Sequence, residues 1–345
     1  MKINNRLIGK KQPVFIIAEA GVNHNGELKL AKKLIDVAVK AGVDAVKFQT
    51  AKAKDVVTKN AGIADYAKKN IKKNISQHEM IKNLELEYKD FKVLKKYCDK
   101  KKIVFLSTPH SFDAIDFLDD LVPAFKFGSG DITNFPALKH AAKKKKPIIL
   151  GTGMSTLKEV KEAIKTIRSA GNNQIAVLHC TTSYPCPVED VNLNAMVTMQ
   201  QKLDCLVGYS DHTLGLTVPI MATCLGATII EKHFTLDRNL PGPDHKASLT
   251  PDELKEMVTE IKDAEKALGK FDKKPTSAEK KIMKLVRKSL IANKDIIKGT
   301  KIDESMVIIK RPGTGMPPAD LSKIIVKKAK RNISKDEIFQ KNMVE

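Results

Sequence analysis

The chain has 345 residues and a formal net charge of +21, with 61 Lys and Arg against 40 Asp and Glu. This length is too great for one small domain and fits a (β/α)8 barrel followed by a smaller module. A charge this high attracts anions of any kind. Because the chain has no Trp and its lysines are spread along helix faces rather than interleaved with aromatic residues, we expect no nucleic-acid partner.

Cysteine usage and hydropathy predict where the protein resides. The 5 Cys form no CxxC pair, and their odd number without a signal peptide indicates reduced thiols. No apolar stretch approaches the ~20 residues that a membrane-spanning helix needs. We therefore expect a cytoplasmic protein that does not insert into a membrane.

The first half of the chain alternates between predicted strands and helices. The strand segments are 13–26, 43–50, 102–109 and 124–131, and the helices lie at about 27–41, 87–101 and 111–121. Gly42 follows the first helix as its expected C′ residue. Each strand begins apolar and ends polar, which predicts a packed interior below a reactive surface.

A long Lys-rich connection, 51–83, interrupts this alternation. Ser76 and Glu79 in it have capping-box spacing, which predicts a helix start. Connections of this length are often functional lids. A lid and a plain insertion both remain open at this point.

The second half continues the pattern. Its strand segments are 146–155, 176–185, one ending at His212 and one ending at His233. Thr156 and Glu159 have capping-box spacing before an amphipathic helix that ends at Gly171, and a helix over 250–269 begins with Thr250 as N-cap and Pro251 at N1. Eight strands with polar ends favour an α/β fold of the (β/α)8 TIM-barrel type over an open doubly wound sheet, which has fewer polar strand ends.

The texture of the chain changes near its end. Residues 271–288 are rich in charge, Pro, Ser and Thr and are predicted to be a linker with a short helix. Residues 289–345 contain short β-branched segments with frequent turn residues, which predicts a small β-rich module near the lower size limit for independent folding. We expect a catalytic barrel over 1–270, a linker over 271–288 and a separate module over 289–345.

Two consecutive strands end in metal-capable groups. The segment VGYSDHT ends in His212, and the segment ATIIEKH ends in His233. In a barrel the carboxyl ends of strands meet at one mouth. Two neutral imidazoles there could hold a divalent ion and leave positions open for water or substrate. The alternative is a pair of histidines at the rim of the barrel without a ligand.

The other polar strand ends suit an anion. The residues collected at the mouth are Glu19, Lys47, Gln49, Thr108, Lys126, Ser129, Tyr184, Ser210, His212, His233 and Asp244. Two lysines with several hydroxyls can replace the water shell of a phosphate or carboxylate. The rival interpretation is a Schiff-base lysine, Lys47 or Lys126, as in barrel aldolases. Neither a GxGxxG strand–helix fingerprint nor a P-loop is present.

Together these segments resemble the sialic acid synthase family over nearly the whole chain. The resemblance lies in IAEAGVNHNG, VKFQT, STP, FKFGSGD, LGTGMS, LHCTTSYP, GYSDHT, EKHF, GPDH and KRPGTG, in this order. It implies a carbon–carbon bond-forming transferase that joins phosphoenolpyruvate to an N-acylated mannosamine-type sugar, giving a nine-carbon 2-keto sugar acid and phosphate. It further implies a barrel followed by an antifreeze-like (SAF) module, and a homodimer formed by domain swapping.

The resemblance also implies residue roles. His212 and His233 would bind the metal cofactor, Mn²⁺ or Mg²⁺. The residues that would bind phosphoenolpyruvate are Lys47, Thr108, Lys126, Ser129, Thr182 and Ser210. Of these, Thr182 stands where bacterial N-acetylneuraminate synthases have Asn. The residues that would act on the sugar are Glu19 and Asp244 beside the metal, Gln49 and Tyr184, and Arg311 of the partner subunit.

The acceptor sugar stays open at this point. Within the family the product is N-acetylneuraminate, its 9-phosphate, legionaminate or pseudaminate. The segments around Tyr184 and His233 are closer to the legionaminate and neuraminate types than to the pseudaminate type. Two other classes remain as alternatives: a Schiff-base aldolase on the same barrel, and a non-catalytic carbohydrate-binding protein.

Overall fold

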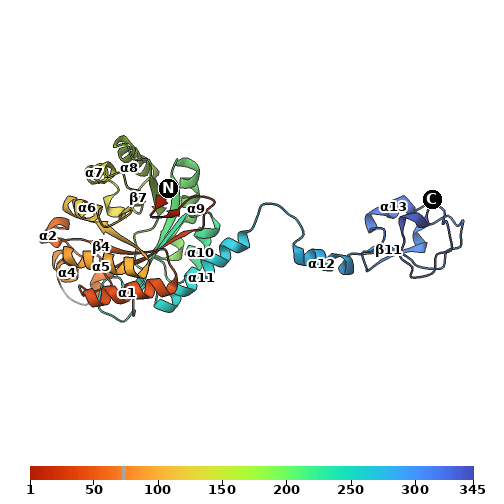
Figure 1. Cartoon of the computed structure of the whole chain (residues 1–345), viewed down its shortest axis with the longest axis horizontal. Coiled ribbons are helices and arrows are strands. Elements are labelled where there is room, and N and C mark those ends of the chain that lie inside the picture. The colour runs from red at the N-terminus through yellow and green to blue at the C-terminus, as the bar shows by residue number, and fades with distance from the viewer. Residues whose placement is uncertain (72–74) are drawn as a thin grey trace. The chain divides into compact units, whose positions relative to one another are not determined.

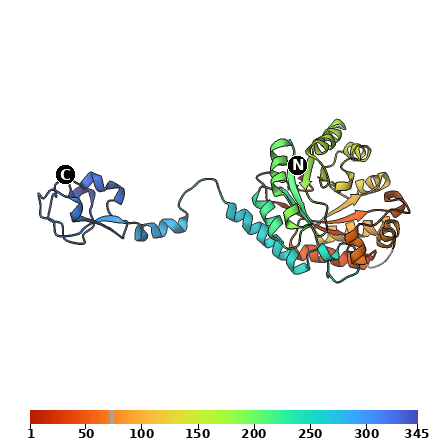
Figure 2. The same cartoon turned by 180° about the vertical axis from the view of Figure 1, so that it is seen from behind.

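The computed structural model of the chain describes residues 1–71 and 75–345 and contains two units, Met1–Gly269 and Lys270–Glu345 (Figures 1 and 2). At the centre of the first unit is a sheet of eight parallel strands. These are β3 (Phe15–Gly21), β4 (Ala45–Thr50), β5 (Val104–Pro109), β6 (Phe125–Phe127), β7 (Ile148–Gly151), β8 (Ile175–His179), β9 (Leu206–Asp211) and β10 (Ile229–His233).

The strand order is β5-β4-β3-β10-β9-β8-β7-β6, and the two end strands, β5 and β6, lie next to each other. The sheet therefore curves into a nearly closed barrel, which confirms the predicted (β/α)8 fold. The surrounding helices are α1 (Leu28–Ala41), α5 (Tyr88–Lys101), α6 (Phe112–Asp119), α7 (Phe135–Lys143), α8 (Leu157–Ser169), α9 (Leu193–Lys202), α10 (Thr217–Cys224) and α11 (Pro251–Leu268) (Figure 1).

The helix boundaries follow local rules that the sequence already contained. Gly42 ends α1 with a left-handed φ of 77°. Thr156 caps α8 in the predicted capping box, and Thr250 caps α11 with Pro251 at its first position, as predicted. Thr250 also forms a capping box. The N-caps Thr156 and Thr250 fix where the strand–helix loops before α8 and α11 end, and these loops carry part of the site.

Two apolar clusters hold the barrel together. The larger one lies between strands and helices and includes Val46, Leu94 and Ile164. The smaller one fills the barrel interior and includes Phe15, Ile17, Ala45, Leu106, Ala124, Ile149, Leu178 and Ile229. A short hairpin that the sequence did not predict, β1 (Lys2–Ile3) with β2 (Arg6–Leu7), adds Ile3 and the neighbouring Ile8 to the interior cluster.

The connection 51–83 contains three helices, α2 (Ala53–Val56), α3 (Asp65–Ile71) and α4 (Gln77–Leu84), while its residues 72–74 lie outside the described residues. Ser76 caps α4 in the predicted capping box with Glu79. None of the helices within 1–71 and 75–345 combines the length and apolar composition that a membrane-spanning helix requires.

The second unit begins with α12 (Ser277–Val286) and contains the antiparallel pair β11 (Ser289–Ala292) and β12 (Val307–Lys310) and the short helix α13 (Leu321–Ile324). Its own core includes Leu290, Ile302, Ile324, Ile333 and Phe339. Much of the expected β structure is present as isolated bridges, such as Ile296 with Ile333, rather than as strands. Short segments separated by turns form one or two ladder bonds before the chain reverses.

Candidate active site

The site follows from the two-residue period of the barrel strands. Side chains two residues apart on a strand point to the same side. In β3, Phe15 and Ile17 belong to the interior cluster, so Glu19 points inward above them. In β10, Ile229 is followed on the same side by Glu231 and His233. The barrel interior therefore changes from apolar at the bottom to ionisable at the carboxyl ends of the strands.

A cavity of about 80 Å³ lies among these upper side chains. Its lining residues are Glu19, Lys47, Gln49, Thr108, His110, Lys126, Gly128, Ser129, Gly151, Cys180, Tyr184, Ser210, His212, Glu231 and His233. Ten of the residues that the sequence placed at the mouth are in this set, and they come from most of the eight strands.

A bulge in β3 sets the position of Glu19. The register between β3 and β4 shifts between Glu19 and Gly21, and Gly21 has a left-handed φ of 52°. A Cβ on Gly21 would lie 3.1 Å from Oε1 of Glu19 and 3.4 Å from Nε2 of Gln49. Glycine is thus required here both for the backbone conformation and for the space beside the carboxylate.

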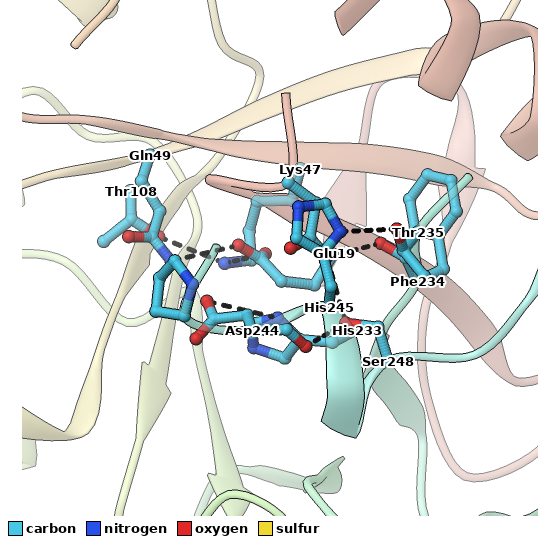
Figure 3. Close-up of polar contacts among 12 residues, drawn as sticks. Glu19, Lys47, Gln49, Thr108, His233, Phe234, Thr235, Asp244, His245 and Ser248 are labelled. Carbon is cyan, nitrogen blue, oxygen red and sulfur yellow. Dashed lines mark hydrogen bonds and ion pairs between the residues drawn. The ribbon is translucent and has the colours of Figure 1, made fainter. Parts of the chain in front are cut away.

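Four buried charges form the centre of the site. Lys47 forms an ion pair with Glu19, and its Nζ lies 3.8 Å from Glu231. Lys126 pairs with the other oxygen of Glu231 at 3.1 Å. Gln49 donates to Glu19 at 3.3 Å, and Lys47 donates to Thr108 at 3.1 Å (Figure 3). Two lysines are therefore balanced by two carboxylates, and one of these, Glu231, was not among the predicted site residues.

The two carboxylates differ in proton affinity. Burial raises the pKa of Glu19 to about 7, although Lys47 opposes the rise. Burial acts on Glu231 in the same direction, but Lys126 and Lys47 outweigh it and lower the pKa of Glu231 to about 2. Near neutral pH, Glu231 is ionised while Glu19 exchanges its proton. Protonation of Glu19 leaves the four-residue cluster with one net positive charge, which favours an anion.

The two predicted metal ligands lie together. The ring centroids of His212 and His233 are 5.7 Å apart, and the ring of Tyr184 lies 4.1 Å from that of His212, with the two planes tilted by 38°. Burial lowers the pKa of both imidazoles, so both are neutral at pH 7. Nδ1 of His212 lies 2.6 Å from the carbonyl oxygen of Thr181, which only accepts. Nε2 of His212 therefore keeps its lone pair.

These two imidazoles suit a divalent ion that has few other ligands from the protein. Nδ1 of His233 is buried without a hydrogen-bond partner, and the carboxylate of Asp244 lies 3.9 Å from it (Figure 3). Across residues 1–71 and 75–345, no group of three or more His, Cys, Asp and Glu side chains is arranged to hold a metal. An ion held by His212 and His233 would thus complete its coordination with water or substrate.

The hydroxyl groups of the site face the same cavity from other strands. Ser210 donates to Glu231 at 3.2 Å, and Ser129 lies 3.1 Å from the thiol of Cys180. Thr182 is exposed and does not line the cavity. Gly153 leaves room between these groups, because a Cβ there would collide with the hydroxyl of Thr182 and approach that of Ser129 to 2.9 Å.

Asp244 lies in the loop after β10, and hydrogen bonds connect this loop to Asn23 near the start of the chain. Asn23 donates to the carbonyl of Phe234 at 2.8 Å and to Ser248 at 3.0 Å. Ser248 in turn donates to the carbonyl of Asp244 at 2.7 Å. Burial raises the pKa of Asp244 to about 6. Asn23, Phe234, Ser248 and Asp244 are called the Asn23 clasp below.

Besides Gly128 and Gly151, three residues of the cavity with titratable side chains were not among the predicted site residues. His110, Cys180 and Glu231 each lie two residues after an inward-facing strand residue, so the two-residue period could have identified them. Arg311 is exposed on the second unit, after β12.

Known proteins match the chain in both units. The model of the NeuB family matches residues 34–273, and that of the SAF domain matches residues 287–345. The N,N'-diacetyllegionaminic acid synthase of Legionella pneumophila is 46% identical over 94% of this chain and 93% of its own length. The enzyme of the same name from Campylobacter jejuni is 46% identical over 94% of this chain and 98% of its own length.

A solved structure agrees with this assignment. The N-acetylneuraminic acid synthetase of Leptospira borgpetersenii serovar Hardjo-bovis, crystallised with citrate, is 35% identical, covers 81% of this chain and 94% of its own, and superimposes with a TM-score of 0.72. The family model spans most of the barrel, the relatives are similar over nearly their full length, and the solved structure has the same fold. This chain therefore belongs to the NeuB family and carries a C-terminal SAF domain.

Proposed function

We propose that this protein is a sugar acid synthase that condenses phosphoenolpyruvate with an N-acetylated amino sugar of the mannosamine type. The products are a nine-carbon 2-keto sugar acid, of the legionaminic acid type, and inorganic phosphate. The observation that carries the proposal is the buried cluster of Glu19, Lys47, Lys126 and Glu231 beside the imidazoles of His212 and His233. The high identity to two N,N'-diacetyllegionaminic acid synthases supports the product class.

Phosphoenolpyruvate would bind at the lysines. Lys47, Lys126 and the hydroxyls of Thr108, Ser129 and Ser210 replace the water shell of its carboxylate and phosphate. Thr182 would join them from the exposed edge. Protonation of Glu19, whose pKa burial raises to about 7, removes a negative charge from the cluster and favours the incoming anion.

The sugar would bind on the side of Gln49, Tyr184 and Asp244. A divalent ion, Mn²⁺ or Mg²⁺, held by His212 and His233 would polarise the aldehyde oxygen of the open-chain sugar. C3 of phosphoenolpyruvate then forms a bond to the aldehyde carbon while Glu19, protonated when phosphoenolpyruvate binds, gives its proton to the aldehyde oxygen, which leaves positive charge at C2. Water adds at C2, and the ionised Glu19 takes up one of its protons. The C2 hydroxyl then becomes the ketone as the C–O bond to phosphate breaks, and its proton leaves with the phosphate.

A coupled assay tests the reaction class. Phosphoenolpyruvate is offered with a panel of 2-acetamido and 2,4-diacetamido sugars, and phosphate release and keto acid are measured. We expect both products in equal amounts with at least one sugar. With ¹⁸O in the bridging position of phosphoenolpyruvate, the label should leave in phosphate, and its retention in the keto acid would exclude C–O cleavage.

Metal dependence has a separate test. Exhaustive chelation should abolish turnover, and Mn²⁺ or Mg²⁺ should restore it. Titration calorimetry with Mn²⁺ alone should show binding to the wild type and at least a tenfold loss in His233→Ala. Full activity in a preparation that elemental analysis shows to be metal-free contradicts this part of the proposal.

The Schiff-base alternative requires a neutral lysine. Burial acts to lower the pKa of Lys47, but Glu19 and Glu231 outweigh it and raise the pKa of Lys47. A lysine that stays protonated is a poor nucleophile. Borohydride added with the sugar or with phosphoenolpyruvate should leave no adduct on Lys47 or Lys126 by mass spectrometry.

We further propose a domain-swapped homodimer in which Arg311 completes the site of the partner subunit, since its planar guanidinium suits an acyl carbonyl. The test mixes two inactive variants, Glu19→Gln and Arg311→Ala. Random pairing makes half of the dimers mixed, and one of the two sites in each mixed dimer is intact, so roughly a quarter of wild-type activity should return. No recovery on co-expression would place Arg311 at its own barrel or outside the site.

A further inference from the structure

A second cavity, of about 260 Å³, opens directly from the polar site. Gln49, His110, Tyr184 and His233 line both cavities, so the two are continuous. Asp244 and Pro243 line the larger one as well. Its size is near the lower end of the ~300–1,000 Å³ range of small-molecule sites, which suits one small ligand.

The opposite wall of this cavity is apolar and belongs to the insertion between β4 and α5. Met80, Ile81 and Leu84 on α4 line it, together with Val56 of α2 and Val22. The three α4 residues lie at helical positions i, i+1 and i+4, which share one face. None of them belongs to an apolar core cluster of the described residues, and none of the α4 side chains is fully buried. This face is therefore directed at the cavity rather than used by the core.

The wall is fixed in place by contacts at both ends of α4. The capping box of Ser76 and Glu79 holds its first turn. At the other end, Glu85 accepts a hydrogen bond from the backbone of Ala53 at 2.6 Å. Gly26, with a φ of 75°, lets the backbone of Asn83 approach, because a Cβ would lie 2.9 Å from the Asn83 carbonyl oxygen. The apolar face is thus a built surface of the cavity.

The cavity is divided by polarity, and the proposed substrate is divided in the same way. The sugar aldehyde must lie near His233, Gln49 and Tyr184, so the far end of the sugar chain meets Met80, Ile81 and Leu84. A methyl group there gains contact with apolar atoms, whereas a hydroxyl loses its water without a partner. None of the described residues lining this cavity is Lys or Arg, and Glu85 is among them. A terminal phosphate would meet no cation there.

We infer that the apolar face of α4 determines acceptor specificity. Met80, Ile81 and Leu84 select an amino sugar whose far end carries a terminal methyl and a second N-acetyl group, over one that ends in a hydroxymethyl or a phosphate. Gln77, on the same wall, offers an amide to the second acetamido group. This inference rests on the proposed function and names the substrate class of that same site.

The test compares kcat/KM for three acceptors that differ at the far end. They are a 2,4-diacetamido-2,4,6-trideoxy sugar, 2-acetamido-2-deoxymannose and its 6-phosphate, each with saturating phosphoenolpyruvate. We expect the wild type to prefer the first by at least tenfold. Ile81→Thr and Met80→Gln should each reduce this preference at least tenfold, with the KM for phosphoenolpyruvate unchanged. Val93→Thr, an exposed site on α5, is the matched control and should keep the preference.

The outcomes separate the two levels of the proposal. If both α4 variants turn over and still prefer the trideoxy sugar as the wild type does, the inference is overturned and the proposed function stands. A wild type that prefers the hydroxymethyl or phosphorylated sugar also overturns it. Absence of phosphate release with every acceptor overturns the proposed function, and the inference with it. Thermal unfolding of each variant verifies that it is folded, which half-buried positions on a capped helix should permit.

Discussion

Ion pairs at the barrel mouth and in the C-terminal unit have similar lengths and very different surroundings. Lys126 and Glu231 are 3.1 Å apart, with side chains only 5% and 4% exposed. In the second unit, Arg331 and Glu337 are 2.6 Å apart, with side chains 53% and 33% exposed. Lys310 and Asp336 form a similar exposed pair at 2.8 Å.

The difference lies in solvation. An exposed pair is screened by water and contributes little to stability. A buried pair loses the hydration of both ions, and its attraction does not reliably offset that loss. A protein that retains four buried charges at one mouth therefore does so for a reason other than stability. Net charge gives no such indication, because most of the 61 Lys and Arg residues lie on the surface.

The largest effect should come from breaking the buried cluster. Glu231→Gln leaves Lys47 and Lys126 with one carboxylate between them, and removal of one partner from a buried pair destabilises by about 3–5 kcal/mol. We expect a large fall in unfolding free energy by denaturant titration and loss of turnover. A variant with wild-type stability and activity would show that the cluster is not the centre of the site.

A smaller loss should follow from opening the Asn23 clasp. Asn23→Ala leaves the carbonyl of Phe234 and the hydroxyl of Ser248 without their donor, and unsatisfied buried groups cost about 1–3 kcal/mol. Because Ser248 holds the backbone of Asp244, kcat should fall while the KM for phosphoenolpyruvate stays constant. Asn173→Ala, an exposed asparagine of the same unit, is the control. If Asn23→Ala and Asn173→Ala change kcat equally, the clasp does not position Asp244.

Gly21→Ala tests the bulge. The left-handed φ of 52° is unfavourable for alanine by about 1–2 kcal/mol. The new Cβ would also press on the carboxylate of Glu19 at 3.1 Å, so kcat should fall together with stability. Gly9→Ala places a Cβ where no atom lies within 4 Å and should change neither.

The pH dependence of stability should separate the two carboxylates. Burial raises the pKa of Glu19 from 4.5 to about 7, so the folded state holds the proton more tightly, and stability falls as the pH rises through this window. The pKa of Glu231 is lowered to about 2, so its contribution is complete above 4.5 and is lost as the pH falls toward 2. In Glu19→Gln, the thermal midpoint should therefore change less with pH between pH 4.5 and 7 than it does in the wild type. An unchanged slope in that variant would assign the dependence to another group.

The smallest effect belongs to the second unit. Arg331→Ala removes an exposed pair with Glu337, which water already screens. We expect no change in the thermal midpoint or in turnover. A marked loss of stability or turnover would mean that exposed ion pairs matter as much in this protein as the buried ones.

The sequence by itself determined the order of the barrel strands and the ends of several helices. The caps at Thr156 and Thr250, the left-handed glycine at position 42 and the alternating strands depend on contacts within a few residues. The polar ends of the predicted strands placed Glu19, Lys47 and Lys126 at the mouth of the barrel. The resemblance to known synthases supplied roles for these residues, which local rules alone do not give.

Only the tertiary structure decided how these groups are paired. Glu231 contacts two lysines from β4 and β6, and Asn23 binds Ser248 across 225 positions of the chain. In the sequence, the half-buried face of α4 has the pattern of any amphipathic helix. Its position opposite His233 depends on how the insertion folds against the mouth of the barrel. Such contacts are fixed by strand order, register and closure of the barrel. A local pattern determines on which side of a strand a residue lies, whereas the partner that it meets depends on distant segments of the chain.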